Sequence, residues 1–319
     1  MPRRVTVTAP SRLHFGMFSF GRSDVRQFGG VGAMIDRPGL KLVLRSGEAF
    51  SVTGPMSEAA AKYARRAHQA YGSSGEPAVE IEVVHAPPAH VGLGTGTQLA
   101  LSIAAGIAAL AGERVPSGDR LAQITGRGRR SAVGTYGFDR GGLIVEGGKY
   151  QTDAISPLIT RLAIPAEWRF VLIRPRGEQG LSGMEESGAF EKLPATPLAT
   201  TDALCREALL HLLPAVQEGE CEQAAESLYR FGYLAGSCFA AHQGGPYATA
   251  ELESLVAWLR EQGVRGVAQS SWGPLLFALV PSAVEAKRCV TLVQDRPDGQ
   301  QYELTVALPC NSGVTIKVE

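Results

Sequence analysis

The clearest chemical signal in the sequence is a glycine-rich stretch, Gly-Leu-Gly-Thr-Gly-Thr-Gln, at residues 92–98. It follows an apolar–polar alternation at 79–84, typical of a strand, and opens an apolar-periodic run at 98–110, typical of a helix. Glycines let several backbone N–H groups turn toward one centre, and a helix N-terminus adds partial positive charge there. We therefore predict that this stretch binds phosphate, with the threonine hydroxyls as further donors. Its residues are Gly92, Leu93, Gly94, Thr95, Gly96, Thr97 and Gln98.

Two common phosphate-binding motifs do not fit this stretch. No Gly-Lys-Ser or Gly-Lys-Thr is present, which excludes a P-loop, and the glycine spacing is GxGxG rather than the GxGxxG of dinucleotide-binding folds. A glycine-rich turn that only lets a helix pack closely on a strand is the alternative interpretation.

A second chemical signal is the arginine-rich stretch Gly126–Ser131, which contains Arg127, Arg129 and Arg130. No acidic residue interrupts the sequence between Thr125 and Phe138. Guanidinium groups bind phosphate and carboxylate oxygens in pairs, so we predict that these arginines bind an anionic substrate. A solvated surface loop is the alternative, because most charge runs are exposed.

Two shorter groups complete the candidate site near the N-terminus. Arg12 and His14 flank Leu13, so on a strand they share one face, where Arg12 would bind an anion and His14 would hydrogen-bond substrate. Arg26, just before the Gly29–Gly30 pair, is a similar candidate. We assign catalytic roles to His14 and Arg26; a partly buried histidine with only structural contacts is the alternative for the former.

A last polar group, Gln269, Ser270, Ser271 and Trp272, lies between two predicted strands. Its amide and hydroxyls suit a phosphate or carboxylate, and Trp272 could stack on an aromatic ring. A hairpin turn with a core tryptophan is the alternative interpretation.

The elements that must position these residues form an intermixed set of strands and helices without strict alternation. This order predicts an α+β fold with two lobes. The predicted strands are 5–8, 40–44, 79–84, 169–174, two within 264–280, 304–308 and 314–318. The predicted helices are 98–110, about 201–213, about 221–240, 249–262 and a further one between 280 and 304.

Composition narrows the class of protein. With 319 residues, 45% of them hydrophobic, the chain is typical of a folded enzyme of about two domains. Its net charge is 0, without the basic excess of a nucleic-acid-binding domain. Five cysteines without a CxxC pair favour a reducing compartment. The longest apolar run, Leu99–Ala111, is too short to span a bilayer, and the N-terminus shows no signal sequence, so we expect a cytoplasmic protein without nucleic-acid or membrane partners.

Several motifs in this order make the chain resemble a known family. The glycine-rich stretch is similar to the second motif of the GHMP superfamily, which includes galactokinase, homoserine kinase and mevalonate kinase. The full set resembles a non-kinase branch, the β-ribofuranosylaminobenzene 5′-phosphate synthases. The motifs are Ser11–Gly16, Gly29–Gly32, His90–Ala100, Gly126–Ser131, Gln243–Gly245 and Gln269–Pro274, and the resemblance covers roughly residues 5–280.

The resemblance implies a GHMP-kinase-like fold, with a ribosomal-protein-S5-like lobe at 1–160 and a ferredoxin-like lobe at 161–319. It also implies a pentosyl transfer in tetrahydromethanopterin biosynthesis. In that reaction 5-phosphoribosyl 1-diphosphate (PRPP) joins 4-aminobenzoate or 4-hydroxybenzoate, with release of CO₂ and diphosphate. We expect Mg²⁺ to bind mainly through the diphosphate, and we expect a homodimer.

The same resemblance argues against a kinase. GHMP kinases commonly carry a Ser-Gly-Ile-Asp stretch, which falls here on Ser131–Gly134, so that a glycine replaces the acid. A GHMP kinase and a non-catalytic phosphate-binding protein nevertheless stay as alternatives. Archaeal members place an aspartate where this chain has Ser19, which leaves the metal ligands open. The acidic candidates are Asp24, Asp36, Asp139 and Glu146, each with a structural role as its alternative.

Overall fold

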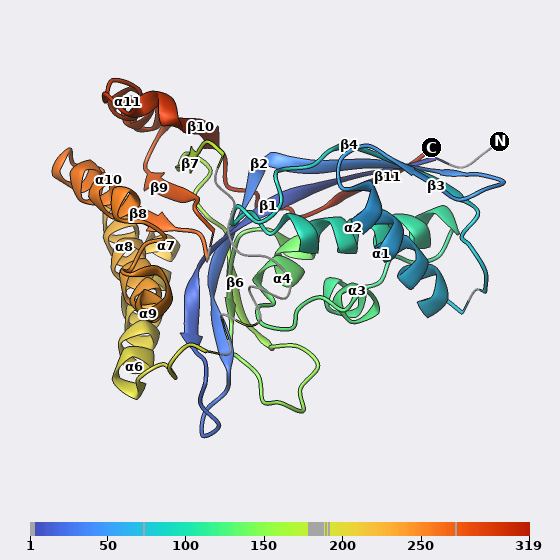
Figure 1. The fold of residues 1–319 in the computed structure, drawn as a ribbon, viewed down its shortest axis with the longest axis horizontal. Helices are drawn as coiled ribbons and strands as arrows, with labels where there is room; N and C mark the ends of the chain where they lie inside the picture. Colours follow the sequence, from blue (N-terminus) through green and yellow to red (C-terminus); the bar gives the residue numbers. More distant parts are fainter. Residues whose placement is uncertain (1–3, 73, 178–187, 189, 191, 272) are drawn as a thin grey trace.

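The computed structural model describes residues 4–72, 74–177, 188, 190, 192–271 and 273–319. These residues form two β-sheets with helices packed against them (Figure 1). Helices and strands are mixed along the chain, so the α+β prediction is confirmed.

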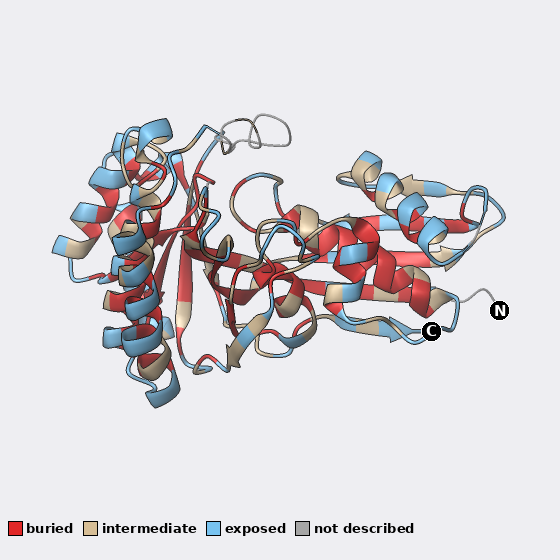
Figure 2. Cartoon of the chain, turned by 90° about the horizontal axis from the view of Figure 1, so that it is seen from below, coloured by how far each residue is buried: buried red, intermediate tan, exposed pale blue. Residues whose placement is uncertain are grey.

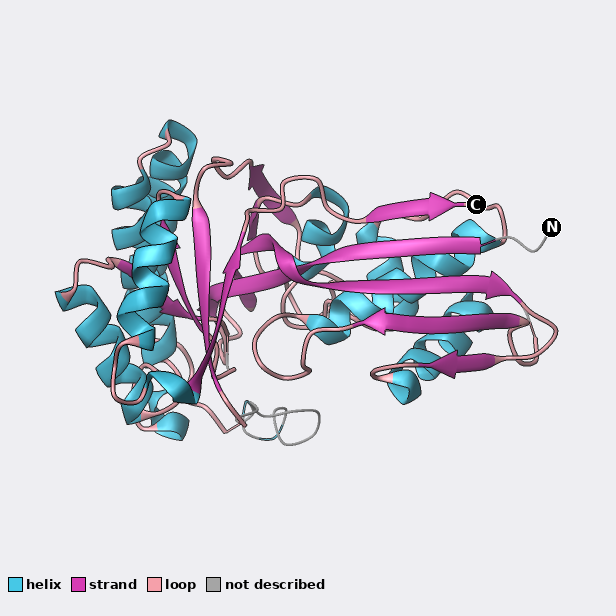
Figure 3. Cartoon of the chain, turned by 90° about the horizontal axis from the view of Figure 1, so that it is seen from above, coloured by secondary structure: helices cyan, strands magenta, loops and turns pink. Residues whose placement is uncertain are grey.

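The larger sheet is built around two long antiparallel strands, β1 (Arg4–Ser19) and β2 (Phe28–Ser46), which run through the middle of the molecule (Figure 3). The strand order is β11-β1-β2-β4-β3, and β5 pairs with both β2 and β6. The pairing of β1 with β2 is irregular between His14 and Gly16. The remaining strands are β3 (Ser51–Thr53), β4 (Val79–His85), β5 (Leu143–Glu146), β6 (Leu158–Leu162) and β11 (Thr315–Val318).

Four helices cover one face of this sheet (Figure 1). They are α1 (Ser57–Ala70), α2 (Thr95–Leu110), α3 (Gly118–Thr125) and α4 (Val133–Arg140). Helix α2 is buried on most sides, and its Gly106 lies so close to β2 that a Cβ there would come within 2.5 Å of the Leu44 side chain. This close packing holds α2 against β2.

The smaller sheet has four antiparallel strands in the order β10-β7-β9-β8. Its strands are β7 (Arg169–Pro175), β8 (Gly266–Gln269), β9 (Leu276–Val280) and β10 (Tyr302–Ala307). The second group of helices lies at the opposite end of the molecule from α1 (Figures 1 and 2). It comprises α6 (Leu198–Glu207), the π-helix η1 (Ala208–Leu212), α7 (Leu213–Glu218), α8 (Cys221–Ser237), α9 (Ala240–Gln243), α10 (Ala250–Glu261), α11 (Ala283–Gln294) and the 3₁₀-helix η2 (Gly299–Gln301).

A shared hydrophobic core joins the two sheets. Phe15 of β1 stacks on Phe277 of β9 with ring centroids 5.4 Å apart, and Phe231 of α8 belongs to the same buried cluster. The C-terminal strand β11 also returns to the larger sheet, where it pairs with β1. The division of the chain at residues 160 and 161 stays a prediction.

The strands and helices predicted from periodicity are all present in the structure, with shifted ends. Helices α1, α3, α4 and α9 and strands β3, β5 and β6 were not predicted. All five cysteines lie in the described part of the chain and are free. None of the described helices combines the length and the apolar character needed to cross a bilayer.

Candidate active site

The glycine-rich stretch forms the turn that begins α2, as the sequence predicted. Gly94 has left-handed backbone angles and precedes the first helical residue, Thr95; its carbonyl accepts from the N–H groups of Thr97 and Gln98. The first N–H groups of a helix have no acceptor within it, so an anion at this end of α2 would meet them directly. A Cβ at Gly94 would lie 3.2 Å from Cβ of Arg12, which explains the need for glycine.

Two of the predicted arginines lie beside this turn. The backbone N–H of Arg12 donates to the Leu93 carbonyl (3.0 Å), and its guanidinium donates to the Gly92 carbonyl (3.4 Å). The Arg127 guanidinium donates to Oγ1 of Thr97 from two nitrogens, at 3.2 and 3.0 Å. The structure thus places one guanidinium on β1 and another on the 127–132 loop next to the first turn of α2.

His14 is buried beside Arg12. Neither ring nitrogen has a hydrogen-bond partner, and the side chain is 1% exposed. Burial, with a smaller contribution from the Arg12 charge, holds the pKa of His14 well below 6.5, so the imidazole is neutral at pH 7. A neutral imidazole with both nitrogens unpartnered can donate one hydrogen bond and accept another.

Ser270 joins the smaller sheet to the glycine-rich turn. Its hydroxyl donates to the Gly92 carbonyl (2.6 Å) and accepts from the backbone N–H of His14 (3.0 Å). The backbone N–H of Ser271 donates to the His14 carbonyl (2.9 Å). The Gln269 amide contacts backbone atoms of Ala248 and Ser271. These bonds hold the 270–271 turn against β1 and the glycine-rich turn. Trp272 lies outside the described residues.

A cavity opens next to His14, between the end of β1 and helices α8 and α9. Two glycines one helical turn apart, Gly232 and Gly236, form part of its wall, and Phe239 adds an aromatic surface. Its polar lining includes Gln243, whose Oε1 is buried without a hydrogen-bond partner. The Gly-x-x-x-Gly spacing in α8, which the sequence analysis did not use, lets neighbouring segments pack closely on the helix: a Cβ at Gly232 would lie 2.9 Å from Cβ of Ala268, and one at Gly236 would lie 2.1 Å from the Pro246 carbonyl oxygen.

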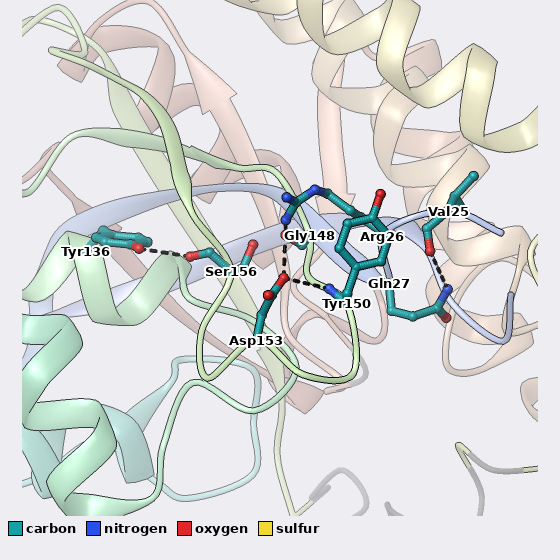
Figure 4. Close-up of polar contacts among 8 residues, drawn as sticks. All are labelled: Val25, Arg26, Gln27, Tyr136, Gly148, Tyr150, Asp153 and Ser156. Carbon is teal, nitrogen blue, oxygen red and sulfur yellow. Dashed lines mark hydrogen bonds and ion pairs between the residues drawn. The ribbon is translucent and has the colours of Figure 1, made fainter. Parts of the chain in front are cut away.

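The other predicted arginines have different surroundings. Arg26, in the connection between β1 and β2, contacts the Gly148 carbonyl (3.2 Å) and Asp153 (3.4 Å), and its guanidinium lies over the Tyr150 ring (Figure 4). All three partners belong to the 147–157 loop rather than to the turn before α2. Arg130 lies over the ring of Phe190, 4.8 Å from its centroid. Arg129 is exposed.

The four acidic candidates for metal binding lie in separate places. Asp24 and Asp36 form ion pairs with Arg22 and Arg37. Asp139, near the end of α4, accepts from the N–H of Gly118 at the start of α3. Glu146 is fully buried on β5. In the described parts of the chain, no three His, Cys, Asp or Glu side chains are grouped closely enough to hold a metal ion.

Helix α4 lies beside the glycine-rich turn. Its residue Gly134 lies where the motif comparison places the acid of a GHMP kinase. The Gln98 side chain donates to the Gly134 carbonyl (2.8 Å), and a Cβ on Gly134 would lie 3.6 Å from Thr97 and 4.0 Å from Arg12. An acidic side chain at residue 134 would therefore face the glycine-rich turn, and this chain has none there.

Comparison with known proteins agrees with this fold and site. Residues 56–140 match the family model described as the GHMP kinases N terminal domain. Over the whole chain the fold is similar to mevalonate pyrophosphate decarboxylase from Streptococcus pyogenes (TM-score 0.70, 13% identity, 97% of this chain and 98% of that one). It is also similar to homoserine kinase from Cytophaga hutchinsonii (TM-score 0.64, 18% identity, 99% and 97%). The fold is that of the GHMP superfamily.

Two curated relatives define the family within that superfamily. The chain is 32% identical over 238 residues to β-ribofuranosylphenol 5′-phosphate synthase of Archaeoglobus fulgidus, covering 70% of this chain and 74% of the relative. It is 28% identical over 295 residues to the enzyme of the same name from Methanothermobacter thermautotrophicus, covering 86% and 88%. The chain belongs to the β-ribofuranosylphenol 5′-phosphate synthase family, and the predicted resemblance is confirmed.

Proposed function

We propose that this protein is a phosphoribosyltransferase that joins PRPP to 4-hydroxybenzoate or 4-aminobenzoate, with release of CO₂ and diphosphate. The relatives are named for a phenol product, which makes 4-hydroxybenzoate the first acceptor to test. Membership of their family supports a role in tetrahydromethanopterin biosynthesis.

The observation that carries this proposal is the set of groups around the glycine-rich turn. Arg12 and Arg127 both contact the glycine-rich stretch, whereas Gly134 lies where the motif comparison places the acid of a GHMP kinase. Asp139, the nearest acid along the chain, is held at the far end of α4 by Gly118. A kinase needs a group that orients or deprotonates its acceptor, whereas a departing diphosphate needs positive charge. The site supplies the second requirement.

The reaction needs this positive charge because its first step is a heterolysis. As the bond from the ribose anomeric carbon to diphosphate breaks, the electron pair leaves with the diphosphate, and positive charge spreads over that carbon and the ring oxygen. The N–H groups of the turn and the two guanidiniums would hold the leaving group. The ring carbon that bears the carboxylate then forms the C–C bond, and loss of CO₂ returns the C–COO⁻ electron pair to the ring. Neither step requires a strong protein base.

We propose that the aromatic acid binds beside His14 by widening a cavity of about 20 Å³, which has room for about one water molecule in this structure. Phe239 gives this cavity an aromatic lining, and His14 and Gln243 supply hydrogen-bonding groups within it. A neutral His14 can accept a hydrogen bond from the para hydroxyl, which leaves the ring electron-rich and so favours attack on the anomeric carbon. Burial of this cavity would also keep water away from the cationic ribosyl group.

Mg²⁺ belongs to this proposal through the substrate. The polar groups at the turn are mainly N–H groups, hydroxyls and guanidiniums. These groups bind phosphate oxygens, and they are not the ligands that Mg²⁺ prefers. They therefore fit a Mg²⁺ ion that binds to the diphosphate of the substrate, because Mg²⁺ commonly takes substrate phosphate oxygens as ligands. The ion would neutralise part of the leaving group's charge. We also propose a cytoplasmic homodimer, which sedimentation of the purified protein would test.

Incubation with PRPP, Mg²⁺ and carboxyl-labelled 4-hydroxybenzoate tests the function directly. The proposal predicts labelled CO₂ in proportion to diphosphate released. Formation of ADP from ATP with a hydroxyl acceptor, and no CO₂ from PRPP, would support a kinase instead. Binding of PRPP without turnover of either substrate would support a non-catalytic protein.

A further inference from the structure

Glu146, the last residue of β5, is a buried carboxylate that the proposed reaction does not use. It has 0% exposure, and neither carboxylate oxygen has a hydrogen-bond partner in this structure. Ionisable groups are rarely found without a hydrogen-bond partner in a protein core, because burying an unpaired charge is unfavourable. Such a group needs an explanation.

The surroundings of Glu146 point to the start of α4. The hydroxyls of Ser131 and Ser156 and the N–H groups of Ala132 and Val133 lie near enough to oppose the rise in the pKa of Glu146, although neither carboxylate oxygen has a hydrogen-bond partner. Within the turn, the Val133 N–H donates to Oγ of Ser131 (3.2 Å). A negative charge is favoured at a helix N-terminus, and α4 begins at Val133. The carboxylate therefore lies beneath the turn that connects the arginine-rich stretch to α4.

That turn is attached to the candidate phosphate site on both sides. Before it, Arg127 contacts Thr97 in the first turn of α2; after it, the Gly134 carbonyl accepts from Gln98. A displacement of residues 131–133 would move both contacts. The residue opposite Glu146 on β2 is Gly30, so no side chain from that strand separates the carboxylate from its neighbours there.

We propose that Glu146 is a positioning residue whose carboxylate holds the 131–133 turn, and thereby Arg127, in place for the diphosphate of the ribosyl donor. This inference rests on the proposed function for the identity of the anion. Among the titratable groups around it, the phenol of Tyr136 on α4 and the ammonium of Lys149 after β5 are close enough to feel its charge.

The energetics of Glu146 separate this role from simple packing. Burial raises the pKa of Glu146 above 4.5, the hydroxyls and N–H groups around it opposing part of that shift. Burial therefore makes the charged form less stable in the folded protein than in the unfolded chain. Glu146→Gln should leave thermal stability at pH 8 unchanged or raised, while anion binding falls. A residue that serves only packing would lose both together.

Calorimetric titration with magnesium diphosphate tests the inference without relying on turnover. Glu146→Gln is expected to weaken diphosphate binding by about tenfold or more, the scale of a lost outer-shell contact. Glu146→Asp, which keeps the charge, is expected to bind more tightly than Glu146→Gln. Glu207→Gln is the matched control, because Glu207 is 9% exposed with an unpartnered oxygen on α6, outside the proposed site, and should bind as the wild type does.

Two results would overturn the inference. One is binding by Glu146→Gln within about twofold of the wild type, less than the tenfold that a lost charged contact gives. The other is a loss of binding matched by a loss of melting temperature, which would make Glu146 a packing residue. Failure of the proposed function is a separate result, since wild-type protein that binds diphosphate but releases no CO₂ would refute the reaction and leave the role of Glu146 measured.

Discussion

Replacing Ser270 with alanine removes one hydroxyl that joins β1, the glycine-rich turn and the smaller sheet. The backbone N–H of His14 loses its acceptor in a buried environment. The Gly92 carbonyl keeps the longer contact from the Arg12 guanidinium at 3.4 Å. An unsatisfied buried donor is unfavourable by about 1–3 kcal/mol, and a lost neutral hydrogen bond by about 1 kcal/mol. We therefore expect the free energy of unfolding to fall by about 2–4 kcal/mol.

Scanning calorimetry and donor kinetics measure this effect. For a chain of this length, that loss corresponds to a melting temperature lower by about 3–6 °C. The KM for PRPP should also rise, because the freed Gly92 carbonyl no longer fixes the turn. Ser102→Ala is the matched control: Ser102 is as buried as Ser270, but its hydroxyl on α2 has no hydrogen-bond partner, so its removal should change the melting temperature by about 1 °C or less. Equal melting temperatures and an unchanged KM in the two variants would refute the assigned role of Ser270.

Three further predictions concern the same site. Gly94→Asp should abolish diphosphate binding in calorimetry, because it adds a carboxylate and a Cβ that would lie 3.2 Å from Cβ of Arg12; retained binding would exclude the turn from the mechanism. Arg127→Ala should weaken diphosphate binding by about 1.5–3 kcal/mol, and by more than Arg129→Ala, whose side chain is exposed; the reverse order would contradict the geometry. Because the pKa of His14 is lower in the folded protein than in the unfolded chain, the unfolded chain takes up a proton first as the pH falls. The contribution of His14 to the free energy of unfolding is therefore highest above pH 6.5 and decreases as the pH falls below that value. Denaturation midpoints between about pH 5 and 7.5 should show this loss in the wild type and a flatter profile in His14→Gln.

Local periodicity was enough to predict the turn before α2. The alternation at 79–84, the glycines at 92–96 and the apolar stripe that follows are contiguous, so their geometry depends on neighbours in the sequence. The same is true of Arg12 and His14, which share a strand face. These residues lie where the sequence analysis expected them, although their roles in binding stay predictions.

The contacts that complete the site could not be predicted from the sequence, because they join segments that are far apart along the chain. Ser270 meets Gly92 across 178 positions, and its hydroxyl, predicted as a substrate ligand, contacts the protein backbone in this structure. Arg26 meets Asp153 across 127 positions. The burial of Glu146 depends on where α4 lies, and α4 is a short helix with two internal glycines, which weakens its sequence signal.

Release of labelled CO₂ from carboxyl-labelled 4-hydroxybenzoate, with PRPP as the only other organic substrate, distinguishes the proposed ribosyl transfer from a kinase reaction. We predict one CO₂ and one diphosphate for each C–C bond formed, and loss of both in Gly94→Asp. Release of no CO₂ from either benzoate, together with transfer of the terminal phosphoryl group of ATP to a hydroxyl, would contradict the proposed function.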